Sequence, residues 1–313
     1  MGDISIVRYN NEFKEQWNTF VRNSKNGLFM FDRNYMNYHS DRFADHSLMF
    51  YSDDKLVSVL PMSEHGDELV SHGGLTFGGF LTDNDMKQHR MLDLFETLLE
   101  YASKNGFKQV IYKAIPHMYH KVSAEEDLYA LFRFNAEPLK IEPSVVLDLK
   151  NPLKMPKGRK AQIGRARREG VIVSESDDFN AFIELENSVL MEYHGAKAVH
   201  TGEELSLLKS RFPEQIHLYT GTLNNELIAG AVIFEYDNLI HTQYLASNDI
   251  SRSIGGLDLV ISTLIEKYKG SKRWLDFGIS TEQGGRVLNE GLISQKEGFG
   301  GRVEVYTTWL LKP

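Results

Sequence analysis

The stretch HLYTGTLNNELIAGAVIFEYDNLIHTQYLA, residues 217–246, decides the fold class. Two apolar runs flank Asn224-Asn225, which predicts a β-hairpin that turns at the two asparagines. Residues 238–246 have the spacing of a β-strand, in which successive side chains point to opposite faces, and they predict the next strand. Further along the chain, an apolar helix closed by a glycine is predicted at 256–270, and a buried strand at 273–279. The second half of the chain therefore combines a hairpin with a strand, a helix and another strand.

The first half repeats this order of elements. LMFYSDDKLVSVLPM, residues 48–62, predicts a hairpin that turns at the two aspartates, and each half begins with a predicted helix. The match lies in element order and spacing rather than in residue identity, and it is typical of a duplication. The remaining predicted elements are helices at 12–27, 86–106 and 178–195, and strands at 68–77 and 109–115.

Together these patterns predict an α/β protein with mixed sheets and two tandem domains. We expect an N-terminal domain over 1–150 and a C-terminal domain over 151–313, a division that fits about 150 residues per domain. The segment 138–156, with four prolines, is interpreted as the connection. A ligand cleft is expected at the sheet ends or between the domains.

Composition excludes several classes of site. The 313 residues include no cysteine, so disulfides, thiolate metal sites and a cysteine nucleophile are excluded. The net charge of −8 argues against nonspecific nucleic-acid binding over the whole surface, and no DNA partner is expected. No apolar run approaches the roughly 20 residues of a membrane span, and the first residues lack the pattern of a signal peptide. A cytoplasmic protein is therefore expected.

Several segments resemble one superfamily. The element order resembles the GNAT acyltransferase fold, and its tandem form resembles the Fem-type proteins, whose members include the aminoacyl transferases of peptidoglycan assembly. QKEGFGG (295–301) resembles their F-K-x-x-F-G motif, with Gln295 in place of Phe. Three other segments of the second half carry this resemblance: KGRKAQIGRARREGVIV (157–173), SNDISRSIGGLDLVISTLIE (247–266) and LDFGIS (275–280). Two segments of the first half resemble bacterial proteins of the same superfamily: HGGLTFGGF (72–80) and IPHMYHKVSAEEDLYALFR (115–133).

This resemblance implies an acyl donor, acetyl-CoA or another acyl-CoA, and a phosphate-binding loop of the form Q/R-x-x-G-x-G/A. Arg252 and Gly255 fit that pattern, whereas Leu257 departs from it. A helix start offers backbone N–H groups and a partial positive charge to a phosphate. The predicted donor-binding residues are Arg252, Ser253, Gly255 and Gly256, and the alternative is a structural turn before the helix.

The glycine-rich stretch 275–301 carries the first choice for chemistry. Lys296 would present a positive charge to a developing oxyanion, and the Fem-type resemblance places this lysine in the transfer site. The alternative is a surface lysine in a loose turn. Asp276 ends a predicted strand and is a candidate for binding a substrate amine or for capping the turn. Glu290, in the same stretch, is a further candidate for substrate binding.

Other candidates are histidines and tyrosines. His241 is a candidate general base, because its ordinary pKa lies near working pH, and Tyr244 is a candidate donor of a proton to the leaving thiolate. His194 and Tyr193 end a predicted helix where GNAT acceptors usually approach. Each of these also has a plain structural interpretation as a packed, surface or helix-capping side chain. In the first half, the candidates for acceptor binding are His72, Tyr119 and His120. No metal is expected, because His117 and His120 lack a defined third ligand.

Three functions are compatible with these patterns. The first is an N-acyltransferase that moves an acyl group from acyl-CoA to an amine of a sugar, glycan or peptide precursor in cell-envelope synthesis. The second is a transferase of the same fold whose donor is aminoacyl-tRNA. Its RNA phosphates would bind the basic segment 154–170, which contains seven Lys or Arg residues and one acid. A solvated helix face is the plain alternative for that segment. The third is a non-catalytic GNAT-like module that binds a small ligand.

Overall fold

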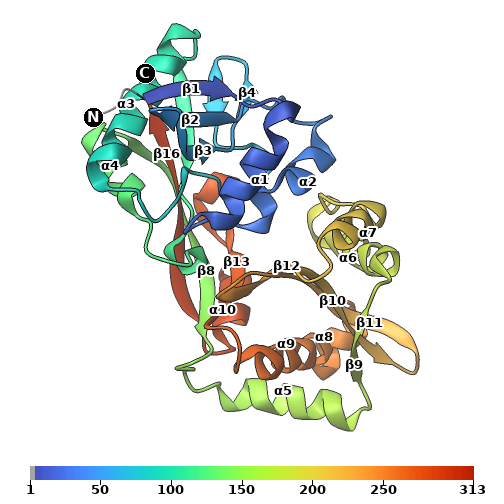
Figure 1. The fold of residues 1–313 in the computed structure, drawn as a ribbon. Coiled ribbons are helices and arrows are strands. Elements are labelled where there is room, and N and C mark those ends of the chain that lie inside the picture. The colour runs from blue at the N-terminus through green and yellow to red at the C-terminus, as the bar shows by residue number, and fades with distance from the viewer. Residues whose placement is uncertain (1–3) are drawn as a thin grey trace. The chain divides into compact units, whose positions relative to one another are not determined.

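The structure of the protein is a computed structural model that describes residues 4–313, apart from the side chains of Tyr193 and His194. The chain folds as two compact units. Unit 1 comprises Met1–Glu142, Gln283–Val287 and Val305–Pro313, and unit 2 comprises Pro143–Glu282 and Leu288–Glu304. Figure 1 shows the chain coloured by residue number. Two strands, β8 (Glu137–Asp148) and β16 (Arg302–Leu311), cross the boundary between the units along the chain.

Unit 1 is built on antiparallel hairpins and one long helix. β2 pairs with both β1 and β3, and β3 pairs with β6, all antiparallel. β5 pairs antiparallel with β4 and parallel with β7, which pairs antiparallel with the end of β16. The strands are β1 (Ile4–Arg8), β2 (Leu48–Ser52), β3 (Lys55–Leu60), β4 (Ser63–His65), β5 (Glu68–Val70), β6 (Leu81–Thr82) and β7 (Gln109–Lys113).

The helices of unit 1 cover an apolar core. α3 contributes Leu94, Phe95 and Leu98 to this core, at the helical spacing seen in the sequence. The helical elements are η1 (Asn11–Phe13), α1 (Lys14–Asn23), η2 (Phe29–Phe31), α2 (Arg33–Met36), η3 (Asn37–His39), α3 (Gln88–Lys104), η4 (His117–Tyr119) and α4 (Glu126–Arg133).

Unit 2 has one mixed sheet between two layers of helices. The strand order is β8-β13-β12-β11-β10-β9, and every pair is antiparallel except β12 with β13. α6 and α7 lie on one side of this sheet, and α5, α8 and α9 lie on the other (Figure 1). The strands are β9 (Ile172–Ser176), β10 (Ile216–Leu223), β11 (Glu226–Glu235), β12 (Leu239–Ser247), β13 (Trp274–Ile279), β14 (Thr281–Glu282) and β15 (Val287–Leu288). The helical elements are α5 (Lys157–Arg168), α6 (Phe179–His194), α7 (Gly202–Arg211), α8 (Asp249–Ile254), α9 (Gly256–Tyr268), η5 (Gln283–Gly285) and α10 (Glu290–Glu297).

Both predicted hairpins are confirmed. Asp53 and Asp54 have φ of 49° and 60°, and Asn224 and Asn225 have φ of 50° and 67°. Two consecutive residues with positive φ are the mark of a type I′ turn, whose twist matches that of the flanking strands. Aspartate and asparagine adopt this conformation more readily than other residues with a side chain. The mixed α/β class predicted from the element order is confirmed as well.

One predicted strand is shorter than expected, and one predicted connection contains a strand. The predicted strand at 68–77 stops at Val70, because His72 has a φ of 41° and turns the chain. The proline-containing segment 138–156 is not a plain connection, since β8 occupies Glu137–Asp148. Its apolar residues Val145 to Leu147 are buried, and this burial outweighs the prolines. Among the described helices, none combines the length and the apolar character needed to cross a bilayer.

Candidate functional site

The site in unit 2 lies where two neighbouring strands separate. β12 and β13 pair in parallel over only three residue pairs, and the last of these joins His241 and Asp276. Beyond this point β12 continues to Ser247 paired with β11, while β13 follows β8 across a register shift between Asp276 and Ile279. The strands therefore diverge inside the sheet and leave a gap where a regular ladder would continue.

A cavity of about 510 Å³ occupies this region. Its lining includes residues of α6 and α9, helices that lie on opposite sides of the sheet (Figure 1). Its volume falls in the range of small-molecule sites, and its wall is mainly apolar. The lining residues are Glu186, Val189, Leu190, Leu245, Ser247, Arg252, Leu257, Ile261, Phe277, Asn289, Leu292, Gln295, Lys296 and Phe299.

Lys296 is held rigidly at this cavity. Its side chain comes from α10 and not from a loose loop, because the Asn289 side chain caps the helix at the N–H of Leu292. Its Nζ donates to the carbonyl oxygens of Gly278 (2.9 Å) and Ile279 (2.7 Å) and to Ser280 Oγ (3.0 Å). Burial lowers the pKa of Lys296 to about 8, and the charge of Asp276 partly opposes that shift.

His241 and Asp276 form a hydrogen-bonded pair next to this lysine. His241 Nδ1 lies 2.8 Å from Asp276 Oδ2, and Asp276 is fully buried. The other carboxylate oxygen, Oδ1, accepts hydrogen bonds from Ser144 Oγ and from the N–H of Gly278. An acid in this position holds the proton on Nδ1 and leaves Nε2 as the basic nitrogen. His241 is not among the cavity-lining residues.

Gly278 joins the pair to the lysine. It has a φ of 74° at the register shift of β13, and a Cβ there would lie 3.2 Å from Cε1 of His241. Its N–H donates to Asp276 and its carbonyl accepts from Lys296. The bend in β13 therefore brings a carboxylate, an imidazole and an amine together, as glycine permits where other residues are strained.

Glu186 is a candidate site residue that the sequence does not single out. It lies on α6 and is only 7% exposed, and no residue that the structure describes forms a hydrogen bond or ion pair with it. Burial raises the pKa of its carboxyl to about 7. The signal was present in the sequence, because Glu186 follows Phe182 and Ile183 at helical spacing and so falls in the apolar stripe of the helix.

Tyr244 lies close to Glu186 without lining the cavity. Its hydroxyl is 2.7 Å from Nδ1 of His200, a second residue that the sequence analysis missed. Burial raises the pKa of Tyr244 to about 12, and the charge of Glu186 adds to this effect. A phenol in this state keeps its proton at neutral pH.

The predicted donor loop is a corner between two helices. Arg252 and Ser253 lie inside the short helix α8, and Gly255, with a φ of 82°, ends α8 and begins α9. A Cβ on Gly255 would lie 2.7 Å from the carbonyl oxygen of Gln162 in α5, and one on Gly256 would lie 2.6 Å from Ser251 Oγ. Both glycines thus allow close packing here, and of the four predicted donor-binding residues Arg252 alone lines the cavity.

The remaining candidates are more dispersed. Glu290 is an exposed residue at the start of α10, and Tyr193 and His194 end α6 with side chains outside the described part of the structure. In unit 1, His72 is buried and stacks on His39 at 5.2 Å, and burial lowers its pKa to about 3. Also in unit 1, the hydroxyl of Tyr119 lies 3.0 Å from that of Tyr306, and His120 Nε2 lies 3.1 Å from the carbonyl oxygen of Ile115.

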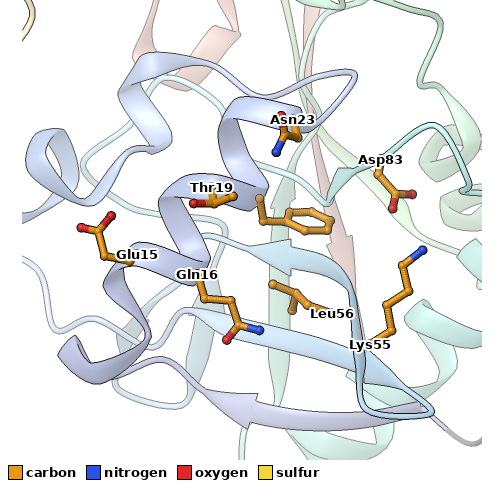
Figure 2. A pocket seen from close by; sticks show the side chains of 8 residues that line it. Glu15, Gln16, Thr19, Asn23, Lys55, Leu56 and Asp83 are labelled. Atoms are coloured by element: carbon orange, nitrogen blue, oxygen red, sulfur yellow. The ribbon is translucent and has the colours of Figure 1, made fainter.

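Unit 1 also carries a surface groove of about 510 Å³ between α1 and β3. Figure 2 shows Gln16 and Thr19 on the helix facing Leu56 and Lys55 on the strand. The Lys55 amine is exposed and pairs with Asp85 at 3.0 Å. The charged groups of this groove lie in solvent, so it lacks the buried ionisable side chains of the unit 2 cavity.

Comparison with known proteins shows the fold. FemX matches with 10% identity and a TM-score of 0.67, over 99% of this chain and 97% of the FemX chain. L-PGS from Bacillus licheniformis matches with 15% identity and a TM-score of 0.64, over 100% of this chain and 93% of its own. A tandem GNAT protein from the clavulanic acid biosynthesis pathway matches with 10% identity and a TM-score of 0.54, over 99% and 98% of the two chains. No protein-family model and no curated protein matches the sequence. These likenesses identify a mixed α/β fold of the tandem GNAT-like, Fem-like kind.

Proposed function

We propose that this protein is an N-acyltransferase that moves an acyl group from acyl-CoA to an amine of a sugar, glycan or peptide precursor. The observation that supports this function best is the cavity at the divergence of β12 and β13, which Lys296 and Arg252 both line. A cell-envelope precursor as acceptor is part of the proposal, in line with the likeness to FemX.

The divergent strands suit a donor with an amide-containing arm. The edge of β12 after His241 faces a gap rather than β13, so its backbone groups can pair with the amides of a pantetheine arm as another strand would. Arg252 would meet a phosphate of the same donor. Its Nη1 and Nη2 are already fixed by the carbonyl of Ser247 and the carboxylate of Asp249, which orients the guanidinium at the cavity.

The reaction places charge where the site can stabilise it. As the amine attacks the thioester carbon, a C–N bond forms, negative charge grows on the carbonyl oxygen and the C–S bond then breaks. The amine proton passes to a base, for which His241, held by Asp276 outside the lining of the cavity, is the candidate, and the same proton then passes to the departing sulfur. Lys296 acts by its charge, because its three N–H groups are already donated to the chain.

The direct test is turnover of acetyl-CoA with a panel of amines. Release of CoA exposes a free thiol, and the chain has no cysteine, so a thiol reagent reports the reaction without background from the protein. We expect Lys296→Met to lower kcat about 100-fold while acetyl-CoA still raises the melting temperature. Lys197→Met, at an exposed lysine, serves as the control. Unchanged turnover in Lys296→Met would remove Lys296 from the mechanism, and tight binding without turnover would favour a ligand-binding module.

One observation favours aminoacyl-tRNA as the donor instead. α5 exposes Lys157, Lys160, Arg167 and Arg168, and only Glu169 adjoins them as an acid. Such a face suits a nucleic-acid backbone. Under this alternative, tRNA binding weakens as salt rises, with a slope set by the number of phosphate contacts. The double variant Lys160→Glu, Arg168→Glu would then lose tRNA binding and keep the melting temperature of the wild-type protein, whereas unchanged tRNA binding would exclude this face.

A further inference from the structure

The carboxyl of Glu186 is an acid in an apolar cavity without a counter-charge. Its side chain lines the same cavity as Val189 and Leu190 of α6 and Leu292 of α10. Glu186 is only 7% exposed, and none of the residues that the structure describes is a hydrogen-bond or ion-pair partner for its carboxyl. A carboxylate that is held mostly out of water and has no counter-charge is less stable than one in solvent, and a cation that entered the cavity would offset that cost.

The cavity's own cations do not neutralise this carboxyl. Lys296 gives all three of its donors to Gly278, Ile279 and Ser280. Arg252 forms its ion pair with Asp249 at 2.6 Å. Tyr244 offers no positive charge either: an ionised phenol would repel the Glu186 carboxylate, and the hydroxyl is hydrogen-bonded to His200.

We propose that Glu186 is a binding site for an ammonium group, carried on an apolar arm, that enters the unit 2 cavity. Entry of a cation would complete the missing ion pair, and the apolar wall would cover the carbon atoms next to the nitrogen. An anion or a neutral hydroxyl would gain less, because it leaves the carboxylate without a counter-charge. The identification of this ammonium with the acceptor amine rests on the proposed function. The binding of an ammonium group to Glu186 does not depend on it.

The test compares two probes of the same shape, benzylammonium and benzyl alcohol, by calorimetry at pH 8. On the wild-type protein we expect benzylammonium to bind at least ~10-fold more tightly than the alcohol, a difference typical of one charge-assisted contact. Glu186→Gln, which keeps the shape, should abolish this preference, and Glu186→Asp, which keeps the charge, should retain most of it. Glu184→Gln, at an exposed acid on the same helix, should behave as wild type.

Equal affinity for the two probes, a preference that survives Glu186→Gln, or no binding of benzylammonium at millimolar concentration would each overturn the proposal. These results separate it from the proposed function. If the protein releases thiol from acetyl-CoA but binds benzylammonium and benzyl alcohol equally, the ammonium site is wrong and the proposed function stands. If the protein prefers benzylammonium but does not bind acetyl-CoA, the proposed acyltransferase function is wrong and the ammonium site stands.

Discussion

Replacing Glu186 by glutamine should stabilise the protein, and should do so more at pH 8 than at pH 4.5. Burial raises the pKa of this carboxyl from an ordinary 4.5 to about 7, so the folded protein holds a proton that the unfolded chain has released between these two values. A state that binds more protons loses stability as pH rises. The wild-type protein therefore loses stability across this window, and a glutamine at 186 does not.

The magnitude follows from the same rise in pKa. A rise from 4.5 to about 7 corresponds to about 3 kcal/mol at full ionisation, since each pKa unit is worth about 1.4 kcal/mol. Water that enters the cavity screens part of this cost, so we expect a gain of about 1–2 kcal/mol at pH 8. For a unit of this size, that gain raises the melting temperature by about 2–8 °C.

Differential scanning calorimetry between pH 4.5 and pH 8 measures the effect. The difference in melting temperature between Glu186→Gln and wild type should be near zero at pH 4.5 and should grow through the titration of the carboxyl. Glu184→Gln, which removes an exposed acid two residues earlier, should show little change at either pH. A pH-independent difference for Glu186→Gln, or a loss of stability at pH 8, would refute the reasoning that the carboxyl is buried without a partner.

Three further predictions follow from the surroundings of the cavity. Lys296 should titrate near pH 8 in a side-chain 15N NMR experiment, and a midpoint near 10.5 would show that its amine is solvated. Asp276→Asn replaces the carboxylate that holds the proton on His241 Nδ1 by a neutral amide, so kcat in the thiol-release assay should fall about 100-fold while acetyl-CoA still stabilises the protein; unchanged kcat would show that the pair only packs. Gly255→Ala should cost about 2–4 kcal/mol, because it combines a positive φ with a contact on Gln162. Gly158→Ala, which meets no neighbouring atom, should cost nothing, and equal melting temperatures for these two alanine variants would contradict the packing argument.

The elements that the sequence predicts well are those with a strong local signal. The turns at Asp53-Asp54 and Asn224-Asn225 need two residues with positive φ, and few dipeptides adopt that conformation so readily. The amphipathic helix α3 carries an apolar stripe along most of its length, and α9 begins with a run of apolar residues that are buried on all sides. By contrast, β8 contains two of the four prolines in 138–156, and it is a strand because it pairs with the distant strands β13 and β16.

The site is harder to predict because its geometry comes from long-range pairing. Asp276 and His241 are 35 residues apart, and they meet only because β12 and β13 align in parallel. The environment of Lys296 is equally non-local: the residues that hold its amine come from the end of β13, about seventeen positions earlier in the chain. A lysine in a glycine-rich stretch suggests a mobile loop, yet the capped helix α10 and the bend at Gly278 fix the amine at the cavity.

Glu186 shows what a physical interpretation of the sequence can still recover. In an amphipathic helix, an acid on the apolar stripe is either paired with a buried cation or placed for a ligand, since an isolated buried carboxylate costs several kcal/mol. The described residues offer Glu186 no cation, and the cavity offers it a ligand-sized space. In the same cavity, Lys296 gives its three donors to the chain and Arg252 pairs with Asp249, so Glu186 is the charged group of this cavity whose need for a partner points most directly to a ligand.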